Sequence, residues 1–544
     1  MPAPELVDAV VVGGGVNGLV AAATLADRGW DVVLLEAHEV GGAVRSQQRG
    51  DAVVDLFSAF YPLSAGSPVL QRLELEAHGL RWRRADAVVA QPMSPDDERG
   101  AVIEHDPQRT AAGLDAWYPG DGDRWLELVA EWRRLRGPML DALLGPWPPV
   151  GAAARLARAM GVAGAPRMAR LLALPATRMG EELFGGEAAR QLIVGNSQHA
   201  DIPPNAAGSG AFGWLLCMLA QDVGFPVPEG GAGELAQALA RRARAAGARV
   251  EEHVPVESVE VSAGRATGVR TADGREIRAR RGVLAALDVE LLLGHLVGHS
   301  HLPRSAVDDL RRFERDLPTL KVNWVLPHAV PWRASAARRA GTVHVGRTVG
   351  PSVRWAADLD SGRTPDDPFL LTGQMATADP TRAPAGHEVL WAYTHLPRAL
   401  VHADAATLER VAREHVHRVS DVIERYAPGA LDGAYDHFVQ TPHDLQDADA
   451  SLVRGALNGG TAQLHQQLVL RPLPGTWGAR LPIEGLYLAG ASAHPGGGVH
   501  GSCGHNAAVA ALHDAGLHGR LTAPVRRAAR RRLFPDRQVG PPVR

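Results

Sequence analysis

The stretch that most constrains the fold lies at the front of the chain: DAVVVGGGVNGLVAAATLADRGWDVVLLEA, residues 8–37. The apolar, β-branched run 9–12 predicts a buried parallel strand. An alanine-rich helix is predicted over 19–28, and a second strand over 31–35. Between the first strand and the helix, the pattern Gly-x-Gly-x-x-Gly is formed by Gly13, Gly15 and Gly18. This order of strand, glycine turn, helix and strand is typical of a Rossmann-type unit that binds a dinucleotide.

Each glycine of this turn is expected for a physical reason. Gly13 permits the tight turn, Gly15 lets the backbone approach a pyrophosphate, and Gly18 lets the helix pack on the strand. The helix N-terminus is expected to face the phosphates, because its unpaired N–H groups favour anions. Glu36 follows the second strand and is expected to accept hydrogen bonds from the adenosine ribose, which disfavours the 2′-phosphate of NADP. The other residues predicted to line this end of the site are Val16, Asn17 and Ala37.

A second glycine loop follows the acid. The segment HEVGGAVRS, residues 38–46, contains Gly41, Gly42 and Arg45. It resembles the second glycine pair of flavoproteins in the amine oxidase and phytoene desaturase superfamily, where this loop runs along the dinucleotide. The commonest form in that superfamily has an arginine directly after the glycines, whereas this chain has Ala43. The resemblance therefore implies that Gly42 contacts the cofactor and that Arg45 supplies the cation.

The middle of the chain resembles a further piece of the same domain. Residues 228–250 predict a glycine turn, an amphipathic helix and a strand. Residues 255–286 predict three short strands joined by turns at 262–264 and 273–274, which form a β-meander. Flavoproteins of this superfamily insert such a meander into their Rossmann core. The resemblance implies that Val256, in the first of these strands, meets the adenine through its backbone.

The C-terminal stretch GLYLAGASAHPGGGVHGSCGHNAA, residues 485–508, predicts a strand, a glycine turn and a helix from residue 502. Glycines 496–498 let the backbone lie against a flat ring, because they have no Cβ. The helix N-terminus can stabilise negative charge at the edge of a reduced flavin. The stretch closely resembles the C-terminal FAD motif of phytoene-desaturase-like proteins, in the branch that includes pyridine nucleotide-disulphide oxidoreductase domain protein 2. The residues that this resemblance assigns to the cofactor are Gly490, Gly497, Gly498 and Val499.

The resemblance covers nearly the whole chain and implies an α/β fold in two parts. The first is a discontinuous Rossmann-type FAD-binding domain with a β-meander, formed by residues 1–70, 225–300 and 475–520. The second is an α+β substrate domain, a mixed sheet with covering helices, formed by residues 71–224 and 301–474. The basic, proline-containing residues 521–544 are expected to form a flexible or docking tail.

Composition excludes several classes of protein. The formal net charge is -3, so no overall basic field recruits nucleic acid. Two cysteines, Cys217 and Cys503, cannot form a disulfide framework. No apolar run is long enough to span a bilayer, and the N-terminus lacks the features of a secretory signal. We therefore expect a cytoplasmic protein.

Homo-oligomerisation stays open. Peripheral membrane contact by the arginine-bearing segment 150–175 also stays open, although ordinary packing with a solvated arginine face is favoured.

Histidines near the C-terminal glycine turn do not predict a metal site. His494, His500, Cys503 and His505 cluster on one turn and helix start, without a distant second pair of ligands. Covalent attachment of the flavin through one of them stays open. The histidines of the second part are expected to be structural or exposed: His199, His437, His443 and His465. The resemblance also places Arg471 near the cofactor, as a structural or substrate contact.

The resemblance implies an FAD-dependent oxidoreductase that passes a hydride from a C–H or N–H bond to flavin N5 and is reoxidised by dioxygen or a quinone. Desaturation of a lipophilic small molecule is favoured over amine oxidation. An aromatic cage for amines needs several Tyr or Trp side chains, and the chain has only 6 Tyr. A flavoprotein with a mainly scaffolding or sensing role is the remaining alternative.

Lys321 is the catalytic candidate. It is the only lysine among 57 Lys and Arg residues and lies in LPTLKVNWVL, whose alternation predicts a strand with one apolar and one mostly polar face. In the amine oxidase superfamily, a lysine on a substrate-domain strand can reach flavin N5 through a water. Resemblance of the segment carries this role to Lys321. A compact ammonium can hold a water where a planar guanidinium cannot, and its pKa can be tuned by burial. The alternative is an exposed lysine retained by chance.

Overall fold

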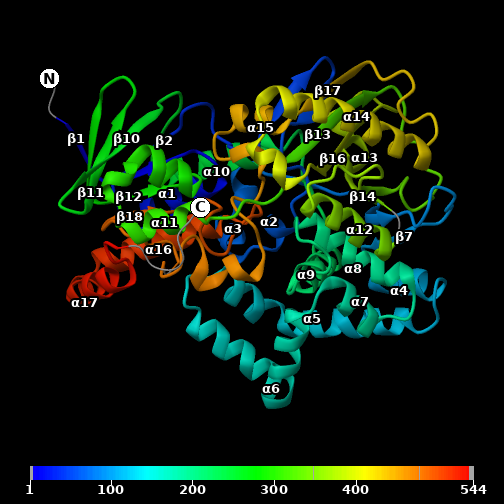
Figure 1. The fold of residues 1–544 in the computed structure, drawn as a ribbon, viewed down its shortest axis with the longest axis horizontal. Helices are drawn as coiled ribbons and strands as arrows, with labels where there is room; N and C mark the ends of the chain where they lie inside the picture. Colours follow the sequence, from blue (N-terminus) through cyan, green and yellow to red (C-terminus); the bar gives the residue numbers. More distant parts are fainter. Residues whose placement is uncertain (1–3, 347, 477, 538–544) are drawn as a thin grey trace.

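The computed structural model describes residues 4–346, 348–476 and 478–537, which form two large sheets with flanking helices (Figure 1). The first sheet has the strand order β10-β11-β12-β1-β2-β9, and β18 pairs with β12. Its strands are β1 (Glu5–Val12), β2 (Val32–Leu35), β9 (Arg249–Glu251), β10 (Val256–Ser262), β11 (Arg265–Thr271), β12 (Glu276–Ala285) and β18 (Leu486–Leu488). The predicted Rossmann strands and the predicted β-meander thus belong to one continuous sheet.

Strand β12 joins the meander to the Rossmann strands. Its first half pairs antiparallel with β11, and its second half pairs parallel with β18. Val12 is in register with both Leu35 and Ala285, and Ala285 is in register with Leu488. The carboxyl ends of β1, β2, β12 and β18 therefore lie at one edge of the sheet. This edge is where doubly wound folds bind their ligands.

Alanine-rich helices pack closely on this sheet. They are α1 (Val16–Ala26), α10 (Gly233–Ala245) and α16 (Ser502–Ala515). Helix α1 starts earlier than predicted, because Gly15 is already its N-cap. It packs against both α10 and α16. At the crossing with α16, a Cβ on Gly504 would overlap the Asn17 carbonyl oxygen, so only glycine permits this approach.

The second sheet has the strand order β17-β13-β16-β15-β14-β6-β7. Its bounds are β6 (Ala87–Gln91), β7 (Ala101–Glu104), β13 (Thr319–Leu326), β14 (Ala340–Val345), β15 (Leu370–Gln374), β16 (Glu388–His395) and β17 (Asp436–Gln440). The sheet is mixed, because β14 runs parallel to β6 while the other pairs are antiparallel. Every residue of β13 is buried, so the polar face predicted for this strand is also covered.

The remaining elements cover or connect the sheets. The longer helices are α4 (Pro107–Asp115), α5 (Asp121–Leu144), α6 (Val150–Ala173), α7 (Ala176–Leu183), α8 (Glu187–His199), α9 (Ser209–Asp222), α11 (Arg304–Arg311), α12 (Val349–Asp360), α14 (Ala405–Tyr426), α15 (Pro442–Ala448) and α17 (Leu517–Leu533). The short ones are α2 (Pro62–Gly66), α3 (Pro68–Gln71) and α13 (Met375–Ala378). Two small strand pairs complete the fold: β3 (Ser46–Arg49) with β4 (Ala52–Asp55), and β5 (Trp82–Arg83) with β8 (Val227–Pro228).

Helix α6 projects away from the rest of the molecule (Figure 1). It consists of two helical arms that meet at Gly161, where φ is 72°. Within the described ranges, no helix combines the length and the apolar character needed to cross a bilayer.

Of the two alternatives for the tail, flexible or docking, the flexible one is wrong up to Leu533, and docking stays a prediction. This segment forms α17, which packs against α16. Arginine and alanine favour helix, and the ion pair of Arg527 with Glu484, at 2.7 Å, holds the helix on the first sheet. The last part of the predicted tail, residues 538–544, lies outside the described residues. The boundaries predicted for the two domains stay a prediction.

Candidate functional site

A cavity lies at the sheet edge where the carboxyl ends of β1, β2, β12 and β18 meet. It is lined by the glycine turn after β1, the end of β2, the loop 41–45 and the turn after β18. The cofactor residues predicted from the sequence that line it are Gly13, Gly15, Val16, Asn17, Glu36, Ala37, Gly42, Arg45, Gly490, Gly498 and Val499. Segments more than 400 residues apart in the chain therefore form one site.

The glycines of the first turn have the roles that their spacing predicts. A Cβ on Gly15 would have no neighbour closer than 3.9 Å, so no protein atom covers the backbone on its cavity side. A Cβ on Gly18 would overlap the Gly13 carbonyl oxygen, and a Cβ on Gly490 would overlap that of Leu287. Gly15 thus provides access, while Gly18 and Gly490 permit close packing. This bare cradle at a helix N-terminus fits a pyrophosphate.

Glu36 is held at the end of β2 by two backbone amides. The Gly14 N–H donates to its Oε2 at 2.5 Å, and the His38 N–H donates to its Oε1 at 2.9 Å. A Cβ on Gly14 would lie 2.9 Å from the Glu36 Cβ. Gly14 is therefore needed to seat the carboxylate. Sequence analysis missed this residue, although its place as the middle glycine of GGG was a signal.

The loop 41–45 closes over the first turn. The Gly41 N–H donates to the Gly14 carbonyl at 2.9 Å. The Arg45 guanidinium donates to the carbonyls of Gly42 and Ala448, at 2.9 and 2.5 Å. It therefore links this loop to the segment 448–459, part of which also lines the cavity.

Asp449 is a lining residue that sequence analysis missed. A Cβ on Gly42 would lie 3.4 Å from its Oδ2. Burial raises the pKa of the Asp449 carboxyl, and the hydrogen bond from the Ser451 backbone N–H opposes this shift. A carboxyl group that is more readily protonated is better tolerated near a bound pyrophosphate than an ordinary one.

The turn after β18 brings a second helix N-terminus to the cavity. Gly501 lines the cavity and is the N-cap of α16. Gly498 has φ 104°, and a Cβ there would lie 2.6 Å from the Leu63 side chain. The Ser67 hydroxyl donates to the His500 carbonyl at 2.7 Å, which ties this turn to the segment before α3.

Three predicted cofactor residues do not line the cavity. Gly18 packs behind the first turn, and Gly497 packs against Asn458. Val256 begins β10 and pairs with Thr271, while the backbone N–H of the nearby Val254 donates to the Glu36 carbonyl at 2.7 Å. A contact of Val256 with the adenine stays a prediction.

Lys321 is buried, with 3% of its surface exposed, so the alternative of an exposed lysine is wrong. Its Nζ donates to the carbonyls of Asp55 and Phe57, at 2.6 and 3.2 Å, and lies 5.5 Å from the centre of the Trp391 ring. Burial lowers the pKa of Lys321 to about 7, although the charge of Asp55 opposes the shift. Lys321 does not line the cavity, and its catalytic role stays a prediction.

Sequence analysis missed a buried polar network beside the cavity. The His395 ring lies 2.7 Å from Asp201 Oδ1, and the Asn458 side chain donates to Asp201 Oδ2 at 2.5 Å. Burial lowers the pKa of His395, but the Asp201 carboxylate outweighs this and the net shift is upward. Asn458 lies between Leu457 and Gly459, two cavity-lining residues, so the network reaches the wall of the site.

Other residues that sequence analysis singled out are enclosed by the protein and make packing or hydrogen-bond contacts within it. Arg471 is completely buried and donates to five backbone carbonyls, those of Asn458, Gly459, Gly460, Thr461 and Ala491. Burial lowers the pKa of His500 to about 4 and raises that of Cys503 to about 11, so both groups are neutral at pH 7. His199 is half-buried beside the His344 ring, with 3.3 Å between a nitrogen of each ring.

The chain is similar to known proteins over nearly its whole length. Residues 17–512 match the family model for flavin containing amine oxidoreductase. The chain is 28% identical over 549 residues to pyridine nucleotide-disulfide oxidoreductase domain-containing protein 2 of Mus musculus, with 93% of each chain covered. It is 27% identical over 531 residues to hydroxyneurosporene desaturase of Cereibacter sphaeroides, covering 93% of this chain and 97% of that one.

Solved structures show the same fold. A variant of putrescine oxidase aligns with a TM-score of 0.59 at 16% identity, covering 94% of this chain and 100% of that one. The mixed α/β architecture predicted from the sequence is thereby confirmed. Since the family model spans most of the sequence, the chain belongs to the flavin-containing amine oxidoreductase family.

Proposed function

We propose that this protein is an oxidoreductase that binds FAD and oxidises a lipophilic small molecule. The observation that carries the proposal is the cavity formed by the first glycine turn, Glu36, Arg45 and the turn after β18. This set of groups matches the chemistry of FAD, which needs a ribose acceptor, a pyrophosphate cradle and a helix N-terminus at the flavin end. Membership of the flavin-containing family supports the same cofactor.

Each part of the cavity has a separate task. Glu36 would hold the ribose hydroxyls, while Gly15 and the N-terminus of α1 would hold the pyrophosphate. The N-terminus of α16 would face the flavin ring and favour negative charge there. When bound, FAD supplies an acceptor for two electrons and a proton.

Lys321 would hold or move a proton close to the site. An ammonium has three N–H donors, and the described contacts with the carbonyls of Asp55 and Phe57 use two of them. The third can hold a water or a substrate group. With a pKa near 7, Nζ can be either protonated or neutral at physiological pH, as an acid–base group requires.

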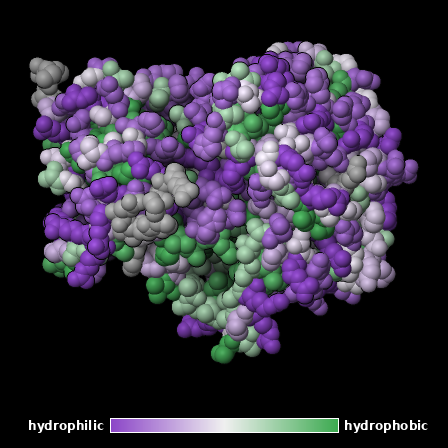
Figure 2. Space-filling view, in the orientation of Figure 1, coloured by the Kyte–Doolittle hydropathy of each residue, from purple (hydrophilic) through white to green (hydrophobic). Residues whose placement is uncertain are grey.

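A lipophilic substrate is supported by the surface of α6. Val162, next to the bend of this helix, is 98% exposed. The segment has four arginines and no acidic residue, and Arg158 and Arg167 form no ion pair with the described residues. Hydrophobic residues gather over and beside α6 in Figure 2. We propose that α6 contacts an anionic membrane and that the substrate comes from the lipid phase.

A cavity at the base of α6 gives such a substrate a place to enter. Its volume is about 460 Å³, and its walls include Val69, Leu140, Leu144 and Val150. His505, in the first turns of α16, also lines it. The hydroxyneurosporene desaturase named above is a relative whose name denotes a desaturation, which agrees with this substrate class.

Amine oxidation is the second candidate. Trp391 and Tyr393 are stacked with ring centres 6.0 Å apart and an interplanar angle of 8°, close to Lys321. A parallel pair of aromatic rings can flank an amine.

Anaerobic stopped-flow reduction of the purified protein would separate the two candidates. The proposal predicts reduction by a polyene or another lipophilic hydrocarbon in detergent or vesicles, and no reduction by primary amines. Reduction by amines alone would favour the second candidate. Reduction by neither class would indicate a scaffolding or sensing role. Mixing the reduced protein with dioxygen or a quinone would then identify the electron acceptor.

A further inference from the structure

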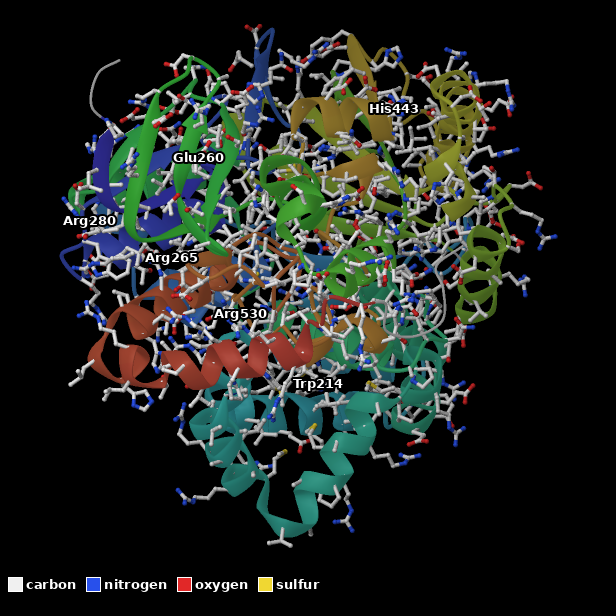
Figure 3. The ribbon with its side chains drawn as sticks, turned by 60° about the vertical axis from the view of Figure 1, so that its left-hand side comes forward. Trp214, Glu260, Arg265, Arg280, His443 and Arg530 are labelled. Carbon is white, nitrogen blue, oxygen red and sulfur yellow. The ribbon has the colours of Figure 1, made fainter. Side chains whose placement is uncertain are left out.

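A second cavity, of about 390 Å³, lies at the first sheet beside α17. It is bounded by β12, by the start of β18, and by α16 and α17. None of its lining residues lines the dinucleotide cavity. Arg265 and Arg280 lie on strands of the sheet above the helix that carries Arg530 (Figure 3). The cavity is therefore a separate site.

Arginine dominates this second cavity. Eight of its 17 lining residues are arginines, whereas Lys and Arg together make up 57 of the 544 residues of the chain. Four are on the body of the protein: Arg265, Arg280, Arg281 and Arg480. Four are on α17: Arg520, Arg526, Arg527 and Arg530. A chain with a net charge of -3 thus concentrates positive charge at one place, and this is the pattern expected of an anion site.

The acidic groups in the cavity do not balance this charge. Its two lining carboxylates are Glu484 and Asp514. Glu484 pairs with Arg265 at 3.2 Å and Arg527 at 2.7 Å. Asp514 pairs with Arg480 at 2.9 Å and Arg526 at 3.5 Å. Each carboxylate already has two arginine partners.

Two arginines of the cavity have no carboxylate partner. Arg520 and Arg530 form no ion pair with any described residue. Burial lowers the pKa of Arg530, although the charges of Glu484 and Asp514 oppose the shift, so the surroundings stabilise this guanidinium incompletely. An anion bound in the cavity beside Arg530 would supply that stabilisation.

We propose that this cavity binds an anion that carries phosphate groups. Guanidinium groups donate paired hydrogen bonds to phosphate oxygens, and several of them around one cavity match a group with more than one negative charge. The anion has two sources with the same chemistry. One is a free polyphosphate, such as pyrophosphate or a nucleoside triphosphate, and the other is the head group of an acidic phospholipid.

The surface of α17 offers a way to distinguish these sources. Leu517, Leu521 and Val525 are 77%, 71% and 70% exposed and follow one another at intervals of four residues. They form one apolar stripe along the helix that carries Arg520 and Arg530. A lipid head group in the cavity would bring this stripe onto the bilayer, whereas a free polyphosphate would leave it in water.

The test uses the full chain saturated with FAD, so that added phosphates cannot occupy the dinucleotide cavity. Calorimetry would measure the binding of pyrophosphate and ATP. Flotation would measure binding to phosphatidylcholine vesicles with and without phosphatidic acid. The test variant is R520Q/R530Q, and the matched control is R531Q/R532Q, which removes the same charge from α17 outside the cavity. If R520Q/R530Q fails to fold, R520K/R530K replaces it, because lysine keeps the charge and loses the paired donors.

The proposal predicts that the test variant binds at least tenfold more weakly, while the control stays within twofold of the parent. Binding of pyrophosphate or ATP would identify a free anion. Binding only to vesicles that contain phosphatidic acid, with loss in Leu521→Asp, would identify a lipid head group. Equal losses of affinity in the test and control variants would show that only the general surface charge matters, and this would overturn the proposal. Absence of binding in both arms would overturn it as well.

Discussion

The Nζ of Lys321 lies 2.6 Å from the carbonyl oxygen of Asp55, a residue 266 positions earlier in the chain. Lys321 is at the third position of β13 in the second sheet, whereas Asp55 ends β4, and the next residue, Leu56, donates to the carbonyl of the cavity-lining Arg45. The Asp55 side chain is also buried and accepts hydrogen bonds from Ser46, Ala232 and Arg382. The only lysine of the chain therefore links the second sheet to β4, the strand that follows the loop 41–45.

The first prediction concerns the rate of flavin turnover. Lys321→Met removes the ammonium and keeps the length of the side chain. We expect flavin reduction or reoxidation to slow at least tenfold, which is about 1.4 kcal/mol of activation free energy. Anaerobic stopped-flow absorbance measures both half-reactions, and the FAD content of the variant must match that of the parent. Unchanged rates in both half-reactions would leave Lys321 with only its structural contacts.

The second prediction concerns stability against pH. Burial lowers the pKa of Lys321 from 10.5 to about 7 in the folded protein. Between these values the unfolded chain binds a proton that the folded chain does not, so this residue makes stability rise with pH. Lys321→Met should remove that contribution. Urea unfolding at pH 7 and pH 10 should show a smaller rise for the variant, and equal rises would contradict the shifted pKa.

The third prediction concerns the turn after β18. Gly498→Val should lower flavin occupancy more than global stability, because the branched side chain would meet Leu63 and the cavity. Gly386→Val is the matched control, since Gly386 also has positive φ and a Cβ there would meet nothing within 4 Å. FAD content per protein and the unfolding midpoint should be measured for both. If the two variants retain the same FAD content, this turn does not contact the flavin.

The fourth prediction concerns the pair of His395 and Asp201. The pKa of His395 is raised, so the pair stabilises the folded state fully below the ordinary histidine pKa of about 6.5 and loses this effect as pH rises through the folded pKa. Asp201→Asn should therefore destabilise the protein more at pH 6 than at pH 9. Urea unfolding at the two values tests this. A destabilisation that does not change with pH would show that the pair is not charged.

The sequence predicted the parts of the site that depend on local geometry. Gly13, Gly15 and Gly18 act within one turn, and their spacing follows from strand, turn and helix dimensions. The same holds for the turn at Gly490 and Gly498, which follows one strand and precedes one helix. Such patterns are short enough to recognise without any knowledge of tertiary contacts.

The parts that were missed depend on distant contacts. His395 and Asp201 are 194 positions apart, and Asn458 is 257 positions from Asp201. No spacing rule connects single polar residues at such separations. The flexibility predicted as one alternative for residues 521–533 failed for a similar reason, because ion pairs with Glu484 and Asp514 hold this basic segment and composition alone does not reveal them.

The most direct test of the account is the identity of the nucleotide that the protein releases. The full chain should be purified, reconstituted with a mixture of FAD, FMN and NAD, washed and denatured by heat, and the released nucleotide identified by chromatography and mass spectrometry. The account predicts FAD at about one equivalent per chain, because Glu36, the glycine cradle and the N-terminus of α16 converge on one cavity. Release of FMN or NAD in place of FAD, or of no nucleotide, would contradict it.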